Sequence, residues 1–285
     1  MAVVDVNHKI AYNLSVQQTP ASSSSPKKIE PAETTRIDCY LAQLEATVPF
    51  LPPSLRYVVC DGFYSKLKWV NKVTDLKLEA IGKLRCDANL RYLNQDPYPG
   101  RGRPRKYAGK VELTDYSNFE LVTSISDTQT LYTAVVWSIS LKRQIRICYL
   151  LNKGDSSCSY AVLFCTDVKL NPYFIYLYYK ARFQIEFIFR DSKQFTGLAD
   201  CQARDLTKLD FHFNSSLTAL NLAKLDAVEQ HPSDSNFVFS MASYKRRGLN
   251  HHLLERFIDK LDLEPTLIKS HPSYSSLCDY GAIAA

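Results

Sequence analysis

The chain has 285 residues, with 35 lysines and arginines against 29 aspartates and glutamates, a net charge of +6. Hydrophobic residues make up 46% and charged residues 22%, an ordinary globular composition that excludes wholesale disorder. No stretch approaches the ~18 consecutive apolar residues of a membrane span, and the N-terminus lacks a signal-peptide pattern, so we expect a cytoplasmic protein without a membrane partner. The eight scattered cysteines form no CxxC pair and indicate neither a zinc site nor a disulfide framework.

The first part of the chain, residues 1–90, alternates between predicted strands and helices, which favours an α/β class. The predicted elements in chain order are a hairpin over 2–6 and 10–16, a polar Ser/Pro loop over 20–31, a helix over 34–48, a strand over 55–60, a helix over 63–73 and a strand over 78–84.

The remaining sequence predicts a change of character and then a return to helices. Residues 91–167 are rich in β runs and predict a β-rich insertion, residues 168–262 predict the helical part of the core, and residues 263–285 predict a disordered tail. The predicted helices span 172–195, 215–229 and 248–261. The first of these begins with Asn171 as a cap and ends before Gly197.

Four polar residues lie on one side of the predicted helix over 172–195. Tyr179, Arg182, Glu186 and Lys193 are offset by 0, 3, 7 and 14 residues. At about 100° per residue they fall within a stripe only ~60° wide. One interpretation is a surface ion pair between Arg182 and Glu186 on a helix whose other faces are core.

The other interpretation is a site for an anionic ligand bound through a metal ion. The positions flanking the stripe are apolar, which predicts a polar groove between buried flanks. These flanking residues are Phe183, Ile185, Phe187, Ile188 and Phe189. In addition, Asp61 ends a predicted strand that follows a helix, at the edge where open α/β sheets place their chemistry.

The spacing Y-x2-R-x3-E-x6-K of these four residues resembles the YREK signature of bacterial insertion-sequence DDE transposases, whose catalytic domain has the ribonuclease-H-like fold. The segment 58–66 resembles the region around that family's second catalytic Asp, and the β-rich insertion precedes the Glu helix as it does in the family. The resemblance covers residues 2 to about 260 and implies a ribonuclease-H-like core with a β-rich insertion.

The resemblance implies that Asp61 and Glu186 hold Mg²⁺ ions, with Mn²⁺ as an alternative, during cleavage and joining of double-stranded transposon and target DNA. Arg182 and Lys193 would bind phosphates near the scissile bond, and Tyr179 would position the backbone. It also implies a homodimer that pairs the transposon ends, and a protein associated with the nucleoid.

The family requires three acids, and the sequence offers no secure first one. The family's first Asp lies on a first strand, and only two strands precede the helix over 34–48. One interpretation is that this strand is missing, that Asp5 is a turn residue, and that the isolated chain lacks strand-transfer activity; the other makes Asp5 the first ligand. The alternatives to an active, incomplete transposase are therefore a catalytically dead relic that binds DNA or the intact enzyme, and a nuclease of the same fold.

A basic loop lies within the β-rich insertion. Arg101, Arg103, Arg105 and Lys106 are interleaved with glycine and proline, and together with Lys110 they give five cations and no acid over 101–110. We expect this loop to contact the DNA backbone, with minor-groove insertion as a narrower alternative and a solvated loop as the other. Trp137 is either packed or stacks on an unpaired base. His212 and Asn214 are expected to cap rather than to catalyse.

Overall fold

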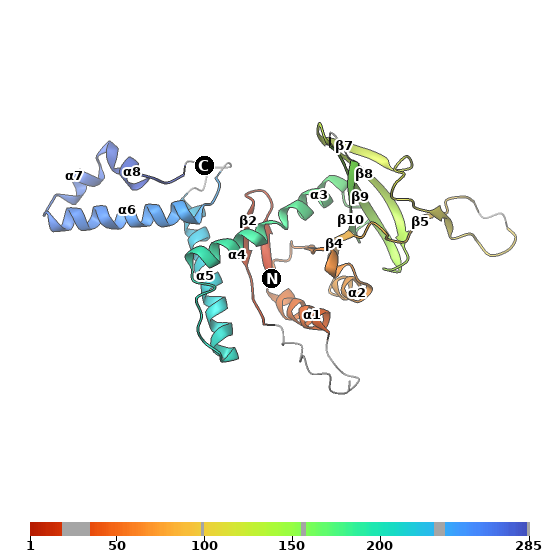
Figure 1. The fold of residues 1–285 in the computed structure, drawn as a ribbon, viewed down its shortest axis with the longest axis horizontal. Coiled ribbons are helices and arrows are strands. Elements are labelled where there is room, and N and C mark those ends of the chain that lie inside the picture. The colour runs from red at the N-terminus through yellow and green to blue at the C-terminus, as the bar shows by residue number, and fades with distance from the viewer. Residues whose placement is uncertain (19–34, 98–99, 155–157, 231–236, 284–285) are drawn as a thin grey trace. The chain divides into compact units, whose positions relative to one another are not determined.

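The computed structural model describes residues 1–18, 35–97, 100–154, 158–230 and 237–283 (Figure 1). The predicted Ser/Pro loop over 20–31 and the loop over 231–236 lie outside these residues. The chain divides into two compact units, and we call residues 19–183 the sheet unit and residues 1–18 with 184–285 the helical unit. No helix in the described part combines the length and apolar character needed to cross a membrane.

The sheet unit is organised around one mixed sheet of eight strands. Its strand order is β3-β4-β10-β9-β8-β5-β6, with β7 paired to β8. β3 and β4 are parallel, and the other pairs are antiparallel. The strands are β3 Tyr57–Val59, β4 Glu79–Leu84, β5 Leu90–Leu93, β6 Tyr107–Lys110, β7 Glu120–Ser126, β8 Gln129–Ser138, β9 Arg143–Lys153 and β10 Cys158–Cys165. The β-rich segment therefore shares one sheet with β3 and β4.

The described part of the sheet unit contains three α-helices. They are α1 Arg36–Thr47, α2 Leu67–Asp75 and α3 Pro172–Ala181. Thr35 and Asp38 form a capping box that starts α1, and the Asn171 side chain accepts the Tyr173 N–H at the start of α3. α3 packs on the sheet through Ile175 and Tyr176, which join a buried cluster with Ile81, Leu131, Cys148, Leu163 and Cys165. This packing fixes the position of α3 beside β3 and β4.

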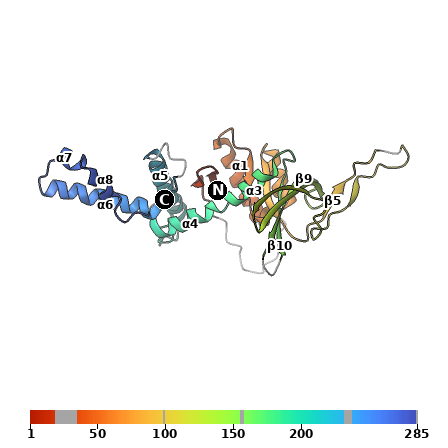
Figure 2. The ribbon, with the colours of Figure 1, turned by 90° about the horizontal axis from the view of Figure 1, so that it is seen from above.

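The helical unit contains a two-stranded hairpin and five helices in its described part. The elements are β1 Ala2–Asp5, β2 Ile10–Asn13, α4 Gln184–Phe195, α5 Leu206–Gln230, α6 Met241–Lys260, α7 Pro265–Lys269 and α8 Pro272–Cys278. Its core joins Ala11 of β2 to residues of α4, α5 and α6 and to Leu198. α7 and α8 lie along α6 (Figures 1 and 2). This small core leaves much of the helix surface exposed.

The mixed α/β class is confirmed and is consistent with a ribonuclease-H-like transposase domain. The hairpin and the elements from α1 to β4 also lie where the sequence predicts them. The prediction of one helix over 172–195 is wrong, because the chain turns at Arg182 and Phe183 between α3 and α4. The Phe183 N–H donates to the Lys180 carbonyl three residues back, so the last turn is tightened. The stretch is rich in aromatic residues, which have a weak helix propensity.

Two further predictions for the helical unit need correction. α5 begins nine residues before the predicted start at 215, and it places His212 and Asn214 within the helix. The predicted disordered tail instead forms α7 and α8 and packs on α6, where Arg247 pairs with Asp279 at 2.7 Å. Pro265 and Pro272 at the first helical positions start both short helices, a signal that the low hydrophobicity of the tail obscured.

Candidate active site

Asp61 stands at the carboxyl end of β3 in the sheet unit. The backbone N–H of Cys60 still pairs with the Ile81 carbonyl of β4 at 3.0 Å, so the strand leads directly to the carboxylate. Asp61 then caps a short 3-10 turn over Gly62–Tyr64, accepting the Phe63 N–H at 2.9 Å. Asp61 is exposed, so its position is fixed by the backbone while the carboxylate still faces solvent.

Aromatic residues pack against one another next to the turn that follows Asp61. The Tyr64 ring lies 4.7 Å from Trp69 and 5.5 Å from Tyr40, measured between ring centroids. Burial, together with nearby Cys60, Tyr40 and Asp61, raises the pKa of Tyr64 to about 12. Burial and the Asp61 charge also raise the pKa of the Cys60 thiol to about 12, so this cysteine packs as a neutral group rather than acting as a nucleophile.

α3 brings two residues of the predicted stripe to the same place. Tyr178 of α3 lies against Tyr57 of β3 with ring centroids 5.4 Å apart, which holds the C-terminal end of α3 beside β3. Burial raises the pKa of the Tyr179 phenol, Arg182 lowers it and Asp61 raises it. The Arg182 guanidinium carbon lies 5.7 Å from the Tyr179 ring centroid. The structure therefore groups Asp61, Tyr179 and Arg182 within the sheet unit.

This grouping combines a carboxylate with a guanidinium and a phenol at one end of a sheet. A guanidinium matches the geometry of a phosphate oxygen pair, and a phenol can donate to a phosphate oxygen or to a sugar. An exposed carboxylate is a hard-oxygen ligand for a divalent cation. The arrangement can thus hold a phosphodiester next to a cation ligand.

Glu186 and Lys193 lie on α4 and therefore belong to the helical unit. Both are exposed, and seven residues apart they project from the same side of this helix. The expected convergence of Asp61 and Glu186 on one cation stays a prediction, because the two residues belong to different units. The predicted buried flanks are partly wrong: Ile188 is buried, but Phe183 and Phe189 are 49% and 42% exposed.

The residues present fit a divalent cation by ligand type. Asp61 and Glu186 offer carboxylate oxygens, and Asp61 commits one oxygen, Oδ1, to a backbone N–H. In the described part of the chain no group of three His, Cys, Asp or Glu side chains converges on one point. The Asp61 site alone therefore supplies one ligand.

The carboxylate of Asp5 is engaged in the turn after β1. Its Oδ1 accepts the backbone N–H groups of Asn7 and His8 at 2.9 and 3.1 Å, and its Oδ2 lies 2.8 Å from His8 Nδ1. These contacts support the interpretation of Asp5 as a turn residue rather than as a metal ligand.

The basic loop joins β5 to β6, and its cations differ in their surroundings. Arg101 and Arg103 are exposed. Arg105 donates to the Ala108 carbonyl at 3.3 Å, and Lys106 Nζ lies 3.7 Å from the centroid of the Trp137 ring. Trp137 is therefore covered on one side by a cation from the loop itself, which favours the packed interpretation of this residue.

The sequence pattern did not draw attention to two neighbours of the site, Gly82 and Ser65. A Cβ added to Gly82 of β4 would lie 2.7 Å from the Phe164 ring and 3.2 Å from Ser65 Oγ, and Ser65 donates to the Lys83 carbonyl at 2.7 Å. This close approach ties the segment after Asp61 to β4. The available signal was Gly82 itself, because a glycine inside a predicted strand often marks a close approach of another group.

A family model described as Transposase DDE domain matches residues 1–222. This range includes both Asp61 and the whole of α4. The chain therefore belongs to the transposase DDE domain family. A comparison with curated proteins found no match.

Proposed function

We propose that the chain cuts transposon ends and joins them to target DNA by metal-dependent phosphoryl transfer. Membership of the transposase DDE domain family supports a transposase that acts on DNA, and such domains generally use divalent metal ions. The observation that carries the proposal is the grouping of Asp61, Tyr179 and Arg182 at the carboxyl end of β3. Asp61 and Glu186 would hold Mg²⁺, or alternatively Mn²⁺, which would stabilise charge on the attacking and leaving oxygens.

The remaining residues of the site would hold the DNA. Arg182 binds the phosphate next to the scissile bond, because its planar guanidinium can donate two parallel hydrogen bonds. The Tyr179 phenol donates a hydrogen bond to the DNA backbone. It stays protonated at neutral pH, because its pKa is raised above the usual value of a tyrosine. Lys193 contacts a phosphate further along the strand. These contacts position the phosphodiester without entering the displacement itself.

Further partners follow from the same proposal. The basic loop with Arg101, Arg103, Arg105 and Lys106 contacts the duplex outside the site, and the chain works as a homodimer on paired ends. Bound to DNA in this way, the protein would be found with the nucleoid.

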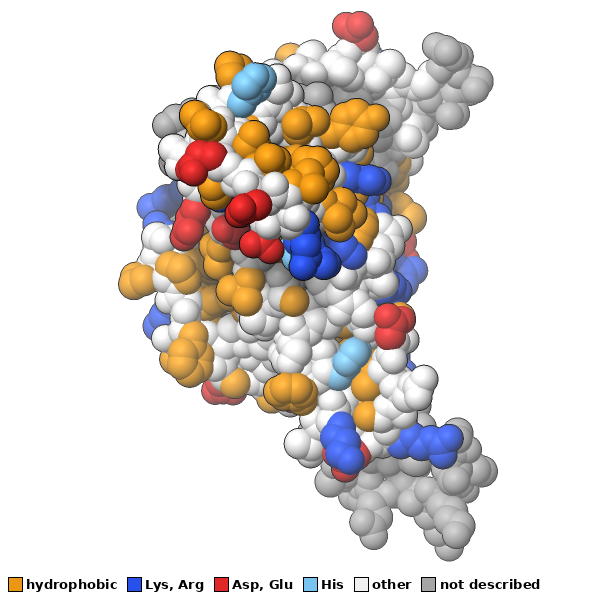
Figure 3. Space-filling model, turned by 90° about the vertical axis from the view of Figure 1, so that its left-hand side faces the viewer, with side chains coloured by type: hydrophobic (Ala, Val, Ile, Leu, Met, Phe, Trp, Pro, Cys, Tyr) orange, Lys and Arg blue, Asp and Glu red, His pale blue; other side chains and the backbone are white. Residues whose placement is uncertain are grey.

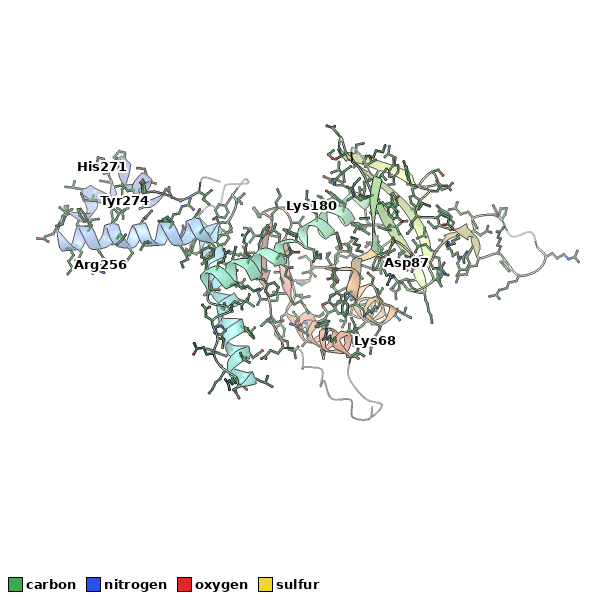
Figure 4. All side chains as sticks on the ribbon, viewed as in Figure 1. Lys68, Asp87, Lys180, Arg256, His271 and Tyr274 are labelled. Atoms are coloured by element: carbon green, nitrogen blue, oxygen red, sulfur yellow. The ribbon has the colours of Figure 1, made fainter. Side chains whose placement is uncertain are left out.

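The test is cleavage and strand transfer on DNA carrying the element's own ends, with and without Mg²⁺. We expect Asp61→Asn and Glu186→Gln each to lower the rate about a thousandfold, because each removes several kcal/mol of charge stabilisation. Asp87→Asn is the matched control, since Asp87 is an exposed acid of the same unit that pairs with Arg85 (Figure 4). Equal rates for Asp61→Asn and the wild type would exclude the proposed site.

A second candidate is a chain that binds DNA or an intact transposase without catalysis. The engagement of Asp5 in a turn favours it, because both carboxylate oxygens already have partners, the Asn7 and His8 N–H groups for Oδ1 and the His8 ring for Oδ2. For this candidate we expect DNA binding without Mg²⁺-dependent cleavage by the wild type. A wild type that cleaves excludes it.

A further inference from the structure

One face of α6 carries large apolar side chains that the helical unit leaves uncovered. Leu249, Leu253 and Phe257 are 51%, 55% and 58% exposed. They are spaced four residues apart, so at about 100° per residue they lie within an arc of about 80°. Leu261 continues the row just past the helix and is 54% exposed. We call this surface the α6 face.

The layer formed by α7 and α8 covers a different side of α6. This side, about 120° to 140° from Leu253, carries buried Ile258 and the pair of Arg247 with Asp279. The layer reaches the border of the α6 face at Asn250, about 60° from Leu253, which donates to the carbonyls of Cys278 and Tyr280. Arg256 projects from the opposite side of α6 (Figure 4). Hydrophobic side chains next to basic ones are visible in the space-filling view (Figure 3).

The charges interleaved with the α6 face are all positive. Lys245, Arg246, Arg256 and Lys260 fall within about 80° of Leu253, whereas no Asp or Glu of α6 does. In the described structure, Arg246, Arg256 and Lys260 form no salt bridge. A partner for this face must therefore offer apolar surface and negative charge together.

α5 of the same chain carries a surface with those properties. Leu222 and Leu225 are 62% and 47% exposed, and exposed Asp226 and Glu229 lie with them within an arc of about 100° on the helix. Asp226 also accepts the Tyr244 hydroxyl of α6 at 2.8 Å. We call this surface the α5 face. The α5 face extends from Thr218 to Glu229, 12 residues or about 18 Å, and the α6 face extends from Arg246 to Lys260, 15 residues or about 22 Å.

We propose that the α6 face of one copy docks on the α5 face of a second copy of this chain. The two faces are similar in length and in apolar character, and their charges are opposite in sign. An α6 face against another α6 face would bring cations together instead. Nucleic acid would neutralise the cations but would leave the leucines and Phe257 without an apolar partner. This inference specifies the homodimer named above, and it uses neither Asp61 nor DNA.

The experiment is sedimentation of the full chain, without DNA or metal, over a range of protein concentrations. We expect a dimer, and we expect Leu253→Glu to raise the dissociation constant at least about tenfold. Leu121→Glu is the matched control, because Leu121 is 59% exposed on β7 in the sheet unit. Circular dichroism verifies that both variants are folded.

Charge exchange separates this proposal from the other partners. The pair Arg246→Glu with Arg256→Glu and the pair Asp226→Lys with Glu229→Lys should each weaken the dimer, and the four changes together should restore it. A wild type that stays monomeric, or four changes that fail to restore a dimer lost in both pairs, overturns the proposal. The proposal is also overturned if Leu253→Glu leaves the oligomeric state unchanged but abolishes binding to a DNA duplex or to anionic lipid vesicles.

Discussion

The sheet unit and the helical unit distribute their apolar residues in opposite ways. Of the twelve largest fully buried side chains in the described structure, eleven belong to the sheet unit and only Ile188 belongs to the helical unit. Of the 22 exposed large hydrophobic side chains, fifteen belong to the helical unit. The sheet unit therefore hides its apolar surface within itself, while the helical unit presents much of its own.

This difference follows from architecture. An eight-stranded sheet with helices packed on it buries long alternating strands, so the groups left exposed at its edge, such as Asp61, are available for chemistry. Helices arranged around a small core bury one stripe each, and the remaining stripes require another surface or stay exposed. The contrast is the one expected if the sheet unit contributes Asp61 to the proposed chemistry and the helical unit provides, besides Glu186, the proposed surfaces for assembly.

The largest expected effect tests the self-contained core of the sheet unit. Ile147 on β9 is 0% exposed, so Ile147→Ala should lower the free energy of unfolding by about 2 to 5 kcal/mol. Urea denaturation followed by tryptophan fluorescence reports this unit, because both tryptophans, Trp69 and Trp137, lie in it. Leu121→Ala should change the value by less than about 0.5 kcal/mol, and a cost similar to that of Ile147→Ala would contradict a stability that comes from the buried core of the sheet unit.

The next effect concerns a buried cation in the helical unit. Lys224 is 4% exposed and donates to the Ala11 carbonyl at 2.7 Å. Burial lowers the pKa of Lys224 to about 8, against the opposing effect of Asp191. Below pH 8 the folded protein carries the full cost of the buried charge, about 3 kcal/mol. As the pH rises from about 8 to 10.5 the folded state loses this proton first, so stability increases over that window.

The measurement is the difference in unfolding free energy between the wild type and Lys224→Met, followed by far-ultraviolet circular dichroism. This difference should move by about 3 kcal/mol in favour of the wild type between pH 7 and pH 10.5. Lys208→Met, at an exposed position of the same helix, should give a difference that does not change with pH. If the difference for Lys224→Met also does not change with pH, the Lys224 ammonium is hydrated rather than buried.

A smaller effect is expected at the edge of the sheet. Arg182→Ala should slow DNA cleavage about 10- to 100-fold, because a hydrogen bond to a charged group contributes about 1.5 to 3 kcal/mol. Arg182→Lys keeps the charge but loses the planar fork, and it should recover only part of the rate. Lys180→Ala is the control, since Lys180 is an exposed cation on the same helix (Figure 4). Equal losses for both alanine variants would point to general charge rather than to a placed guanidinium.

Much of the fold could be predicted from sequence where local signals were strong. The hairpin, α1 with its cap, and the strand that ends at Asp61 each combine a hydrophobic period with a clear start or stop residue. The motif spacing put Tyr179 and Arg182 on one side of a predicted helix, and only the resemblance to a transposase family linked them to Asp61. In contrast, the turn at Arg182 carries neither Gly nor Pro, so the aromatic-rich stretch from Pro172 to Phe195 predicted one continuous helix.

Other features depend on interactions between distant residues and could not be predicted from local patterns. The tail folds because α8 finds partners on α6, for example the pair of Arg247 with Asp279. The engagement of Asp5 depends on a turn geometry that allows one carboxylate to accept from two backbone N–H groups. The exposure of Phe189 similarly reflects which surfaces α4 meets, information that an amphipathic pattern does not contain.

The last prediction concerns the basic loop, where the sheet unit exposes charge without apolar surface. Replacing Arg101, Arg103, Arg105 and Lys106 by Ala should make the dependence of DNA affinity on salt shallower, by a slope of about 0.9 for each phosphate that the loop no longer neutralises. Affinity measured over a series of salt concentrations gives this slope. Lys68→Ala with Lys72→Ala is the control, because these lysines already pair with Asp38 and Glu45.

The four cations should not contribute equally to that slope. Lys106 lies over the Trp137 ring and Arg105 donates to the backbone of the loop, so both have partners without DNA. Arg101 and Arg103 follow Gly100 and Gly102, whose positive φ values of 79° and 82° hold a backbone conformation that glycine tolerates best. Arg101→Ala with Arg103→Ala should therefore account for most of the change in slope. An equal change from Arg105→Ala with Lys106→Ala would mean that DNA draws these two residues away from their partners.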